Sequence, residues 1–218
     1  MFAVLSSVKG GVGTSVTSAA LALLASRDSS RPTYLVDLAG DQSAINGLSD
    51  AHDGLDAWLT SPDRRLTDLT VDITPQLRLV PSGSMSRCDL PDLDGLTLAL
   101  DELRAHAHIV IDAGCLDTTK AFESLGPRRL LVIRPCYVAL RAAVAESTRW
   151  DGVIVVRPPD RVLTTRDVVN VCGLPLVADI PMTADISRAV DAGVLPSRLP
   201  AALDRALRPV VGELVVRS

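Results

Sequence analysis

The residues best suited to chemistry lie in one glycine-rich stretch near the N-terminus. Residues 9–15 read KGGVGTS, directly after an apolar run and directly before an alanine- and leucine-rich segment. In such a loop, successive backbone N–H groups point into one concavity at a helix N-terminus, where the helix dipole adds to their attraction for phosphate. Glycines permit the positive φ angles that this path needs. The stretch predicts a phosphate-binding loop formed by Lys9, Gly10, Gly11, Val12, Gly13, Thr14 and Ser15.

A glycine-rich strand-to-helix turn without a ligand is the alternative interpretation. Two later apolar runs favour the phosphate-binding one, because they end in Asp37 and Asp112. Carboxylates at these strand ends could support a Mg²⁺ ion, for which the hydroxyl of Ser15 is also correctly placed. Either carboxylate could instead be satisfied by nearby backbone amides.

Short β-branched runs alternate with helical patterns along the whole chain. This alternation predicts an α/β fold, a doubly wound and mainly parallel sheet of about seven strands with helices on both faces, in one domain over 1–218. We expect caps at Thr14, at Asp92 or Asp94, and at Thr164 or Thr165. Expected strands cover 2–8, 33–38, 77–80, 108–113, 130–134, 152–157 and 174–180, and expected helices cover 14–26, 93–107, 139–150 and 164–173.

Two segments are less regular. Between about 40 and 75, residues 56–72 suggest two short helices over the sheet edge. The tail over 199–218 is helical, with Pro209 breaking the helix or forming a first turn. Its apolar side could anchor to a membrane, but packing onto the sheet is the favoured interpretation.

The loop resembles that of the ParA/MinD family of deviant Walker A ATPases, which reads K-G-G-x-G-K-[ST]. The resemblance continues over roughly residues 2 to 195: 34–48 look like the second strand and switch I, 108–114 like the Walker B strand, and 177–193 like the segment that closes the nucleotide pocket. Residues 77–83 and 130–143 also resemble family segments. The pattern is similar to divergent members linked with Flp-type pilus secretion and cell-pole placement.

The resemblance implies ATP and Mg²⁺ as cofactors and a homodimer as the working form. The lysine that matches Lys9 reaches the partner's ATP across the dimer. Ser15 and Asp112 would hold Mg²⁺, Asp112 through water, and Asp37 would support the Ser15 end. Pro181 lies in the segment that closes the pocket, and Arg157 takes the place of an asparagine that contacts adenine.

Three departures from the family pattern concern three separate tasks. Thr14 replaces the loop lysine, Ala39 replaces a second strand-two aspartate that helps place water, and Arg157 replaces the asparagine. Losing one electrostatic donor at a reacting centre costs about 2.7–4 kcal/mol. Asp41 could substitute for the missing carboxylate as a catalytic group beside Asp37. We expect hydrolysis to be slow or lost, while Arg134, Arg141 or Arg157 could still supply charge for binding.

Composition limits the other possibilities. The net charge of −4 gives no overall basic field for nucleic acid, and no apolar run is long enough for a signal peptide or a membrane span. The four cysteines form no C-x-x-C pair, which favours reduced thiols and a cytoplasmic location, with a position peripheral to a membrane or nucleoid as the alternative. Histidines 106 and 108 lack a nearby third metal ligand.

The sequence therefore predicts a degenerate ParA/MinD-like nucleotide-binding protein that dimerises as a positioning or scaffold module. Its protein partner would belong to a positioning or secretion system that places a pilus machine, a chromosome or a division site. One alternative is an active ATPase that cycles between monomer and dimer on DNA or membrane. Another is a partner-binding domain without nucleotide. Scattered arginines near the C-terminus give only weak support to DNA binding.

Overall fold

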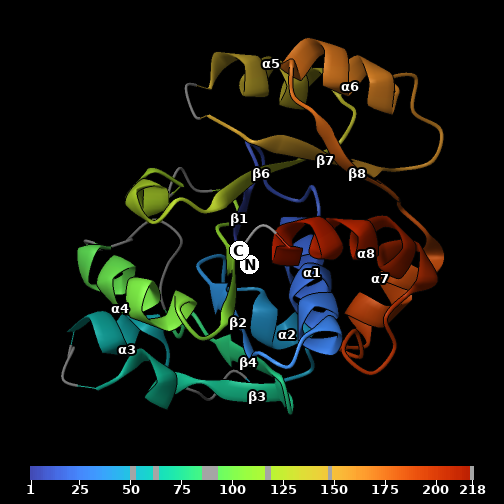
Figure 1. Cartoon of the computed structure of the whole chain (residues 1–218). Helices are drawn as coiled ribbons and strands as arrows, with labels where there is room; N and C mark the ends of the chain where they lie inside the picture. Colours follow the sequence, from blue (N-terminus) through green and yellow to red (C-terminus); the bar gives the residue numbers. More distant parts are fainter. Residues whose placement is uncertain (50–52, 61–63, 85–92, 116–118, 147–148, 217–218) are drawn as a thin grey trace.

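The computed structural model describes residues 1–49, 53–60, 64–84, 93–115, 119–146 and 149–216. Within them, one eight-stranded sheet has the order β3-β4-β2-β5-β1-β6-β7-β8 (Figure 1). Every neighbouring pair is parallel except β3 and β4 at one edge. The strands are β1 Phe2–Ser6, β2 Thr33–Asp37, β3 Val71–Thr74, β4 Leu77–Val80, β5 His108–Asp112, β6 Arg128–Ile133, β7 Gly152–Arg157 and β8 Leu176–Pro181.

The α/β fold with a mainly parallel sheet is confirmed, and the sheet has one strand more than expected. The additional strand, β3, is an antiparallel edge strand of four residues that are only partly buried or exposed. Its short, irregular pattern gives little signal in the sequence. A tight turn to β4, in which the Leu77 amide donates to Thr74 Oγ1 at 3.1 Å, brings it to the sheet edge.

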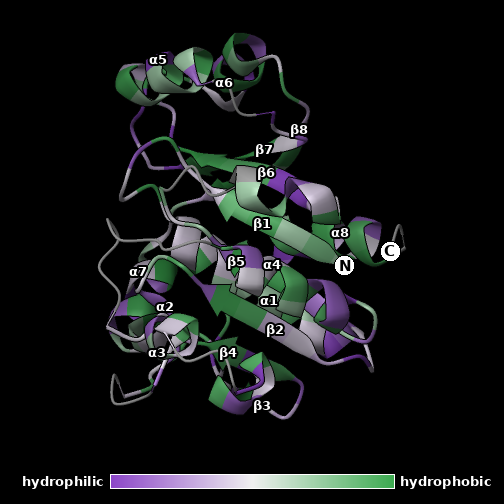
Figure 2. Ribbon diagram, turned by 90° about the vertical axis from the view of Figure 1, so that its left-hand side faces the viewer, coloured by the Kyte–Doolittle hydropathy of each residue, from purple (hydrophilic) through white to green (hydrophobic). Residues whose placement is uncertain are grey.

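Helices cover both faces of the sheet. They are α1 Thr14–Asp28, α2 Gln42–Ile45, α3 Leu55–Thr60, α4 Asp94–Arg104, α5 Tyr137–Ala145, α6 Thr165–Cys172, α7 Ala184–Asp191 and α8 Ala201–Val216, with 3₁₀ segments η1 Leu66–Leu69 and η2 Thr119–Leu125. Side chains of α1, α7 and α8 pack on one face. On the other face, α3 and α4 form one apolar cluster and α5 and α6 form a second. Figure 2 shows mostly hydrophobic strands between helices of mixed character.

Successive side chains in each strand point to opposite faces of the sheet, which explains why helices pack on both faces. In β1, Ala3 and Leu5 face the α1 cluster, whereas Val4 faces the α4 cluster. A strand covered on both faces reads as a nearly continuous apolar run, as the sequence predicted.

The N-terminal ends of α1, α4 and α6 can be compared with the caps expected from the sequence. Thr164 caps α6 in a capping box with Asp167, which confirms that prediction. Thr14 does not cap α1, because Gly13 occupies the cap position and no side chain accepts a hydrogen bond there. The expected cap at Asp94 is wrong, because Leu93 occupies the cap position of α4 and Asp94 is the first helical residue, and Asp92 lies outside the described residues.

The C-terminal helix packs onto the body of the protein, as the favoured interpretation predicted. Its apolar side, Leu203, Leu207, Val210, Val211 and Leu214, is buried against α1 and β8. The expected break at Pro209 is wrong, since α8 continues through it. Burial of apolar residues on both sides of the proline stabilises the helical path against the lost hydrogen bond. No helix among the described residues is long and apolar enough to cross a membrane.

The two short helices expected over 56–72 are present as α3 and η1. The histidines at the start of β5 have ordinary structural surroundings. His108 is buried and contacts Ser29 Oγ at 2.9 Å and the Met1 amino group at 2.8 Å, whereas His106 is exposed. The described residues contain no cluster of three metal-ligating side chains, and Cys88 lies outside them.

Candidate functional site

The glycine-rich loop links the end of β1 to the first turn of α1. Gly11 has φ +74° and Gly13 has φ +101°, a region that side chains disfavour, so the loop depends on glycine at both positions. Ser7 anchors the loop, because its hydroxyl shares one hydrogen between the Lys9 carbonyl at 3.0 Å and the Gly114 carbonyl at 2.9 Å. The loop is therefore tied to the end of β5.

The backbone N–H groups of this loop are available as hydrogen-bond donors. Within the described part of the chain, no acceptor takes the N–H groups of residues 10–15. They lie at the N-terminus of a helix of 15 residues, where the helix dipole also favours an anion. A Cβ added at Gly10 or Gly11 would meet nothing within 4 Å, so the loop faces open space. The arrangement fits a phosphate group.

A cavity of about 400 Å³ lies against the loop. Its wall brings together residues from five parts of the chain. They include Gly10, Gly11, Gly13, Thr14 and Ser15 of the loop, Ala39 and Asp41 after β2, Gly114 and Cys115 after β5, Arg134 after β6, and Val190 of α7. This size is within the range of small-molecule sites. Six predicted site residues, including Thr14 and Asp41, thus line one cavity.

Asp112 does not line the cavity, but its carboxylate lies next to the side chain of Ser15, which does. The Asp112 carboxylate is fully buried and accepts the Gly114 amide at 3.2 Å, and the Ser15 side chain lies close enough to lower its pKa. Burial raises the pKa of Asp112. A hydroxyl and a carboxylate are oxygen ligands of the kind that Mg²⁺ prefers, directly or through water. The pair fits the predicted metal site.

Gln42, which carries no functional signal in the sequence, contacts both members of this pair. Its side-chain Nε2 donates to Asp112 Oδ2 at 2.7 Å and to the Ser15 carbonyl at 2.9 Å. Asn46 Nδ2 in turn donates to the Gln42 carbonyl at 2.8 Å and to its Oε1 at 3.2 Å. Gln42 is fully buried, although it begins a helix of four residues. A buried amide therefore partners the carboxylate predicted to support the metal.

Asp37 faces the backbone that follows its own strand. Its Oδ1 accepts the amides of Ala39 at 2.9 Å and Gly40 at 2.7 Å, and its Oδ2 accepts the amide of Gln42 at 3.1 Å. Burial raises the pKa of Asp37 to about 7, with a further contribution from the carboxylate of Asp112, its register partner on β5. These bonds shape the turn that carries Gln42, and Asp37 itself lies outside the residues that line the cavity.

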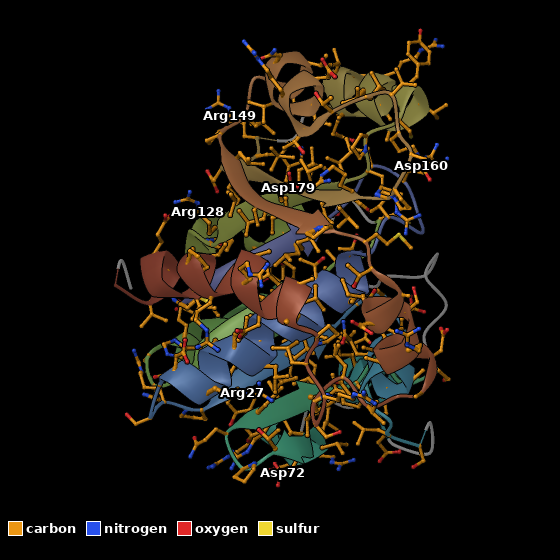
Figure 3. The ribbon with its side chains drawn as sticks, turned by 90° about the vertical axis from the view of Figure 1, so that its right-hand side faces the viewer. Arg27, Asp72, Arg128, Arg149, Asp160 and Asp179 are labelled. Carbon is orange, nitrogen blue, oxygen red and sulfur yellow. The ribbon has the colours of Figure 1, made fainter. Side chains whose placement is uncertain are left out.

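The remaining predicted residues do not line the cavity. Lys9 is exposed at the start of the loop, and Val12 is buried. Arg157 donates from Nε to Asp179 Oδ1 at 3.1 Å, and Thr165 donates to the other oxygen of Asp179 at 2.8 Å. Asp179 is labelled in Figure 3 on β8, the strand that ends at Pro181 beside Arg157.

Arg134 was one of three arginines considered from the sequence as a source of positive charge, and it is the one that lines the cavity. Its Nε donates to the Val12 carbonyl at 3.3 Å. Arg141 is exposed on α5, and Arg157 is paired with Asp179.

No protein-family model matches the sequence, and no curated protein sequence matches it significantly. Solved structures do match. The MinC:MinD cell division protein complex of Aquifex aeolicus has a TM-score of 0.79 at 20% identity, over 99% of this chain and 95% of that chain. A ParA family ATPase from Chlorobium tepidum TLS has a TM-score of 0.79 at 18% identity, over 98% and 100%.

A third structure, the septum site-determining protein MinD complexed with Mg-ADP from Pyrococcus horikoshii OT3, has a TM-score of 0.77 at 19% identity over 98% of this chain and 96% of that chain. The chain therefore has the fold of the MinD and ParA P-loop ATPases. This agrees with the fold that the loop and the strand pattern predicted.

Proposed function

We propose that the chain binds ATP with Mg²⁺ in the cavity beside the glycine-rich loop and acts as a dimerising positioning or scaffold module, with hydrolysis slow or lost. The observation that carries this proposal is the row of open N–H groups over residues 10–15, next to the Ser15 and Asp112 pair. Phosphate would bind to the N–H groups, and Ser15 and Asp112 would hold the metal. When bound, Mg²⁺ would neutralise charge on the β- and γ-phosphates.

Slow hydrolysis follows from the side chains around the reacting end of the cavity. Thr14 carries no charge and is only 5% exposed, and Ala39 has no carboxylate to place water. Asp37 directs both oxygens at backbone amides. Asp41 remains as the acidic side chain lining the cavity among the described residues. The site can thus hold phosphates better than it can stabilise their transfer.

The positioning role is supported by the kinds of protein that share this fold. They include a MinC:MinD cell division complex, a McdA protein from Cyanothece in complex with ATP, and a plasmid partition protein from Borrelia burgdorferi bound to AMPPNP. Lys9 is exposed at the rim of the loop, where a second copy of the chain could be contacted. A homodimer and a protein partner of a positioning or secretion system complete the proposal, in which a DNA or membrane surface is a subordinate possibility.

Sedimentation velocity with Mg-ATP, with Mg-ADP and without nucleotide tests the dimer. We expect a dimer with Mg-ATP and monomers in the other two conditions, and we expect Lys9→Ala to remain monomeric. Arg141→Gln, which changes an exposed charge on α5, is the matched control and should dimerise. Monomers under every condition would contradict the dimeric module.

ATP turnover tests the expected loss of hydrolysis. The wild type should show little turnover, and Thr14→Lys combined with Ala39→Asp should raise it. Melting curves of the double variant would establish that it folds. Rapid turnover by the wild type would instead favour the active ATPase.

A second candidate, a partner-binding domain without nucleotide, is favoured by one observation. Gln42 already satisfies Asp112 Oδ2 at 2.7 Å, so the carboxylate has a partner in the absence of metal. Under this candidate, millimolar Mg-ATP would leave the melting temperature unchanged. Under the main proposal it would raise it, because a ligand that binds only the folded state stabilises that state.

A further inference from the structure

Arg134 follows β6 and enters the cavity from the side of the sheet that carries α1. Side chains along β6 alternate, with Val132 in the cluster under α1 and Ile133 in the cluster under α5. The next residue, Arg134, therefore points to the α1 face, where the glycine-rich loop lies. Its Nε donates to the Val12 carbonyl at 3.3 Å, which holds the guanidinium against the loop.

The charge of this side chain is unusual in its surroundings. Among the described residues that line the cavity, Arg134 is the one cationic side chain. Within the described part of the chain, no carboxylate lies within ion-pair distance of it. A half-buried arginine beside open N–H groups adds positive charge to a site that already favours an anion.

We propose that Arg134 is the phosphate-binding residue that supplies the positive charge absent at position 14. This assignment rests on the proposed nucleotide binding and names the side chain that would contact the phosphate chain of the nucleotide. A guanidinium has five N–H donors in a planar fork. With Nε directed to Val12, the two terminal nitrogens remain to bind phosphate oxygens. Thr14, at the start of α1, lines the same cavity, so a lysine at this position would face the same phosphates.

Isothermal titration calorimetry with Mg-ATP, Mg-ADP and AMP tests the assignment in the wild type, Arg134→Gln and Arg134→Lys. A hydrogen bond to a charged group is typically worth enough to change affinity by about 10- to 100-fold. We expect Arg134→Gln to weaken Mg-ATP binding by about that factor and AMP binding much less. Arg134→Lys should retain part of the affinity. Arg141→Gln, an exposed arginine on α5, should bind like the wild type.

A rescue variant separates charge from loop anchoring. If Arg134 acts through its charge, Thr14→Lys should raise Mg-ATP affinity more in Arg134→Gln than in the wild type, because the two cations then replace one another at the phosphates. If Arg134 only holds the Val12 carbonyl, Thr14→Lys would raise the affinity equally in both backgrounds, and this result would overturn the assignment. Melting curves without nucleotide would show that each variant folds.

The outcomes also distinguish this assignment from the proposed function. Wild-type binding that is unchanged in Arg134→Gln would overturn the role of Arg134 and leave nucleotide binding intact. Absence of binding by the wild type itself would overturn both.

Discussion

At the scale of single residues, the buried carboxyl of Asp112 depends on Gln42. The Gln42 amide donates to Asp112 and to the Ser15 carbonyl, so it joins the metal-site residues to the turn after β2. Among the described residues, Gln42 is the one whose side-chain amide donates to Asp112. Removal of the amide should leave a buried oxygen of Asp112 without that donor.

We predict that Gln42→Ala lowers the free energy of unfolding by about 1–3 kcal/mol, the usual cost of leaving a buried polar group unsatisfied. Urea denaturation without nucleotide would measure it. Gln76→Ala is the matched control, because the side chain of Gln76 is exposed in the turn before β4, and its effect should be small. Equal stability of the two variants would show that the Gln42 bond contributes nothing.

The sequence predicts some of these residues and misses others for a physical reason. Residues 9–15 and Asp112 are predictable because a contiguous loop and a strand end carry their own local signal. Gln42 is not, because its importance comes from a contact with Asp112, 70 positions away along the chain. Arg134 was selected only as one of three arginines, since the alternation of β6 decides its direction.

At the scale of elements, two glycines fix the packing of the turn after α2 on the turn after α7. A Cβ on Gly47 would lie 2.3 Å from the Gly193 carbonyl oxygen, and Gly47 has φ +69°. The contact matters for the site because α2 begins with Gln42 and α7 contributes Val190 to the cavity wall.

We predict that Gly47→Ala destabilises the protein by more than about 2 kcal/mol, because backbone strain at positive φ adds to a clash with backbone. Gly126→Ala is the control, since Gly126 has φ +62° but no atom lies within 4 Å of its added Cβ. It should cost only about 1–2 kcal/mol for the backbone strain. Chemical denaturation compares the two, and identical losses would show that the Gly193 contact is not tight.

The elements themselves were largely predictable. The central strands appear in the sequence as continuous β-branched runs because both of their faces are buried. The edge strand β3 was missed, since four half-buried residues carry little pattern. The continuation of α8 through Pro209 could not be predicted either, because packing of Leu207 and Val210 against α1 and β8 decides it.

At the scale of the whole molecule, His108 joins the start of β5 to the end of α1 and to the start of β1. It lies between Ser29 Oγ and the Met1 amino group. Burial lowers the pKa of His108 to about 4, with further contributions from the positive Met1 amino group and Arg31. The folded state therefore holds this imidazole neutral at pH values where an unfolded chain protonates it.

This difference between the folded and unfolded pKa makes the stability of the protein depend on pH. Between the unfolded pKa of about 6.5 and the folded value of about 4, the unfolded state binds more protons, so stability falls as the pH falls. We predict that His108→Gln reduces this slope and that His106→Gln, an exposed neighbour, leaves it unchanged. Denaturation at several pH values between 7 and 4 would measure both. A slope that is the same in all three proteins would contradict this account.

The central claim is that the loop over residues 9–15 and the Ser15 and Asp112 pair still bind nucleotide despite Thr14. Calorimetric titration of ATP into the wild-type protein, with and without Mg²⁺ and beside Ser15→Ala, tests it most directly. We predict saturable binding in the micromolar range that weakens without Mg²⁺ and in the variant. An absence of binding at millimolar ATP would contradict the claim and leave the loop as architecture alone.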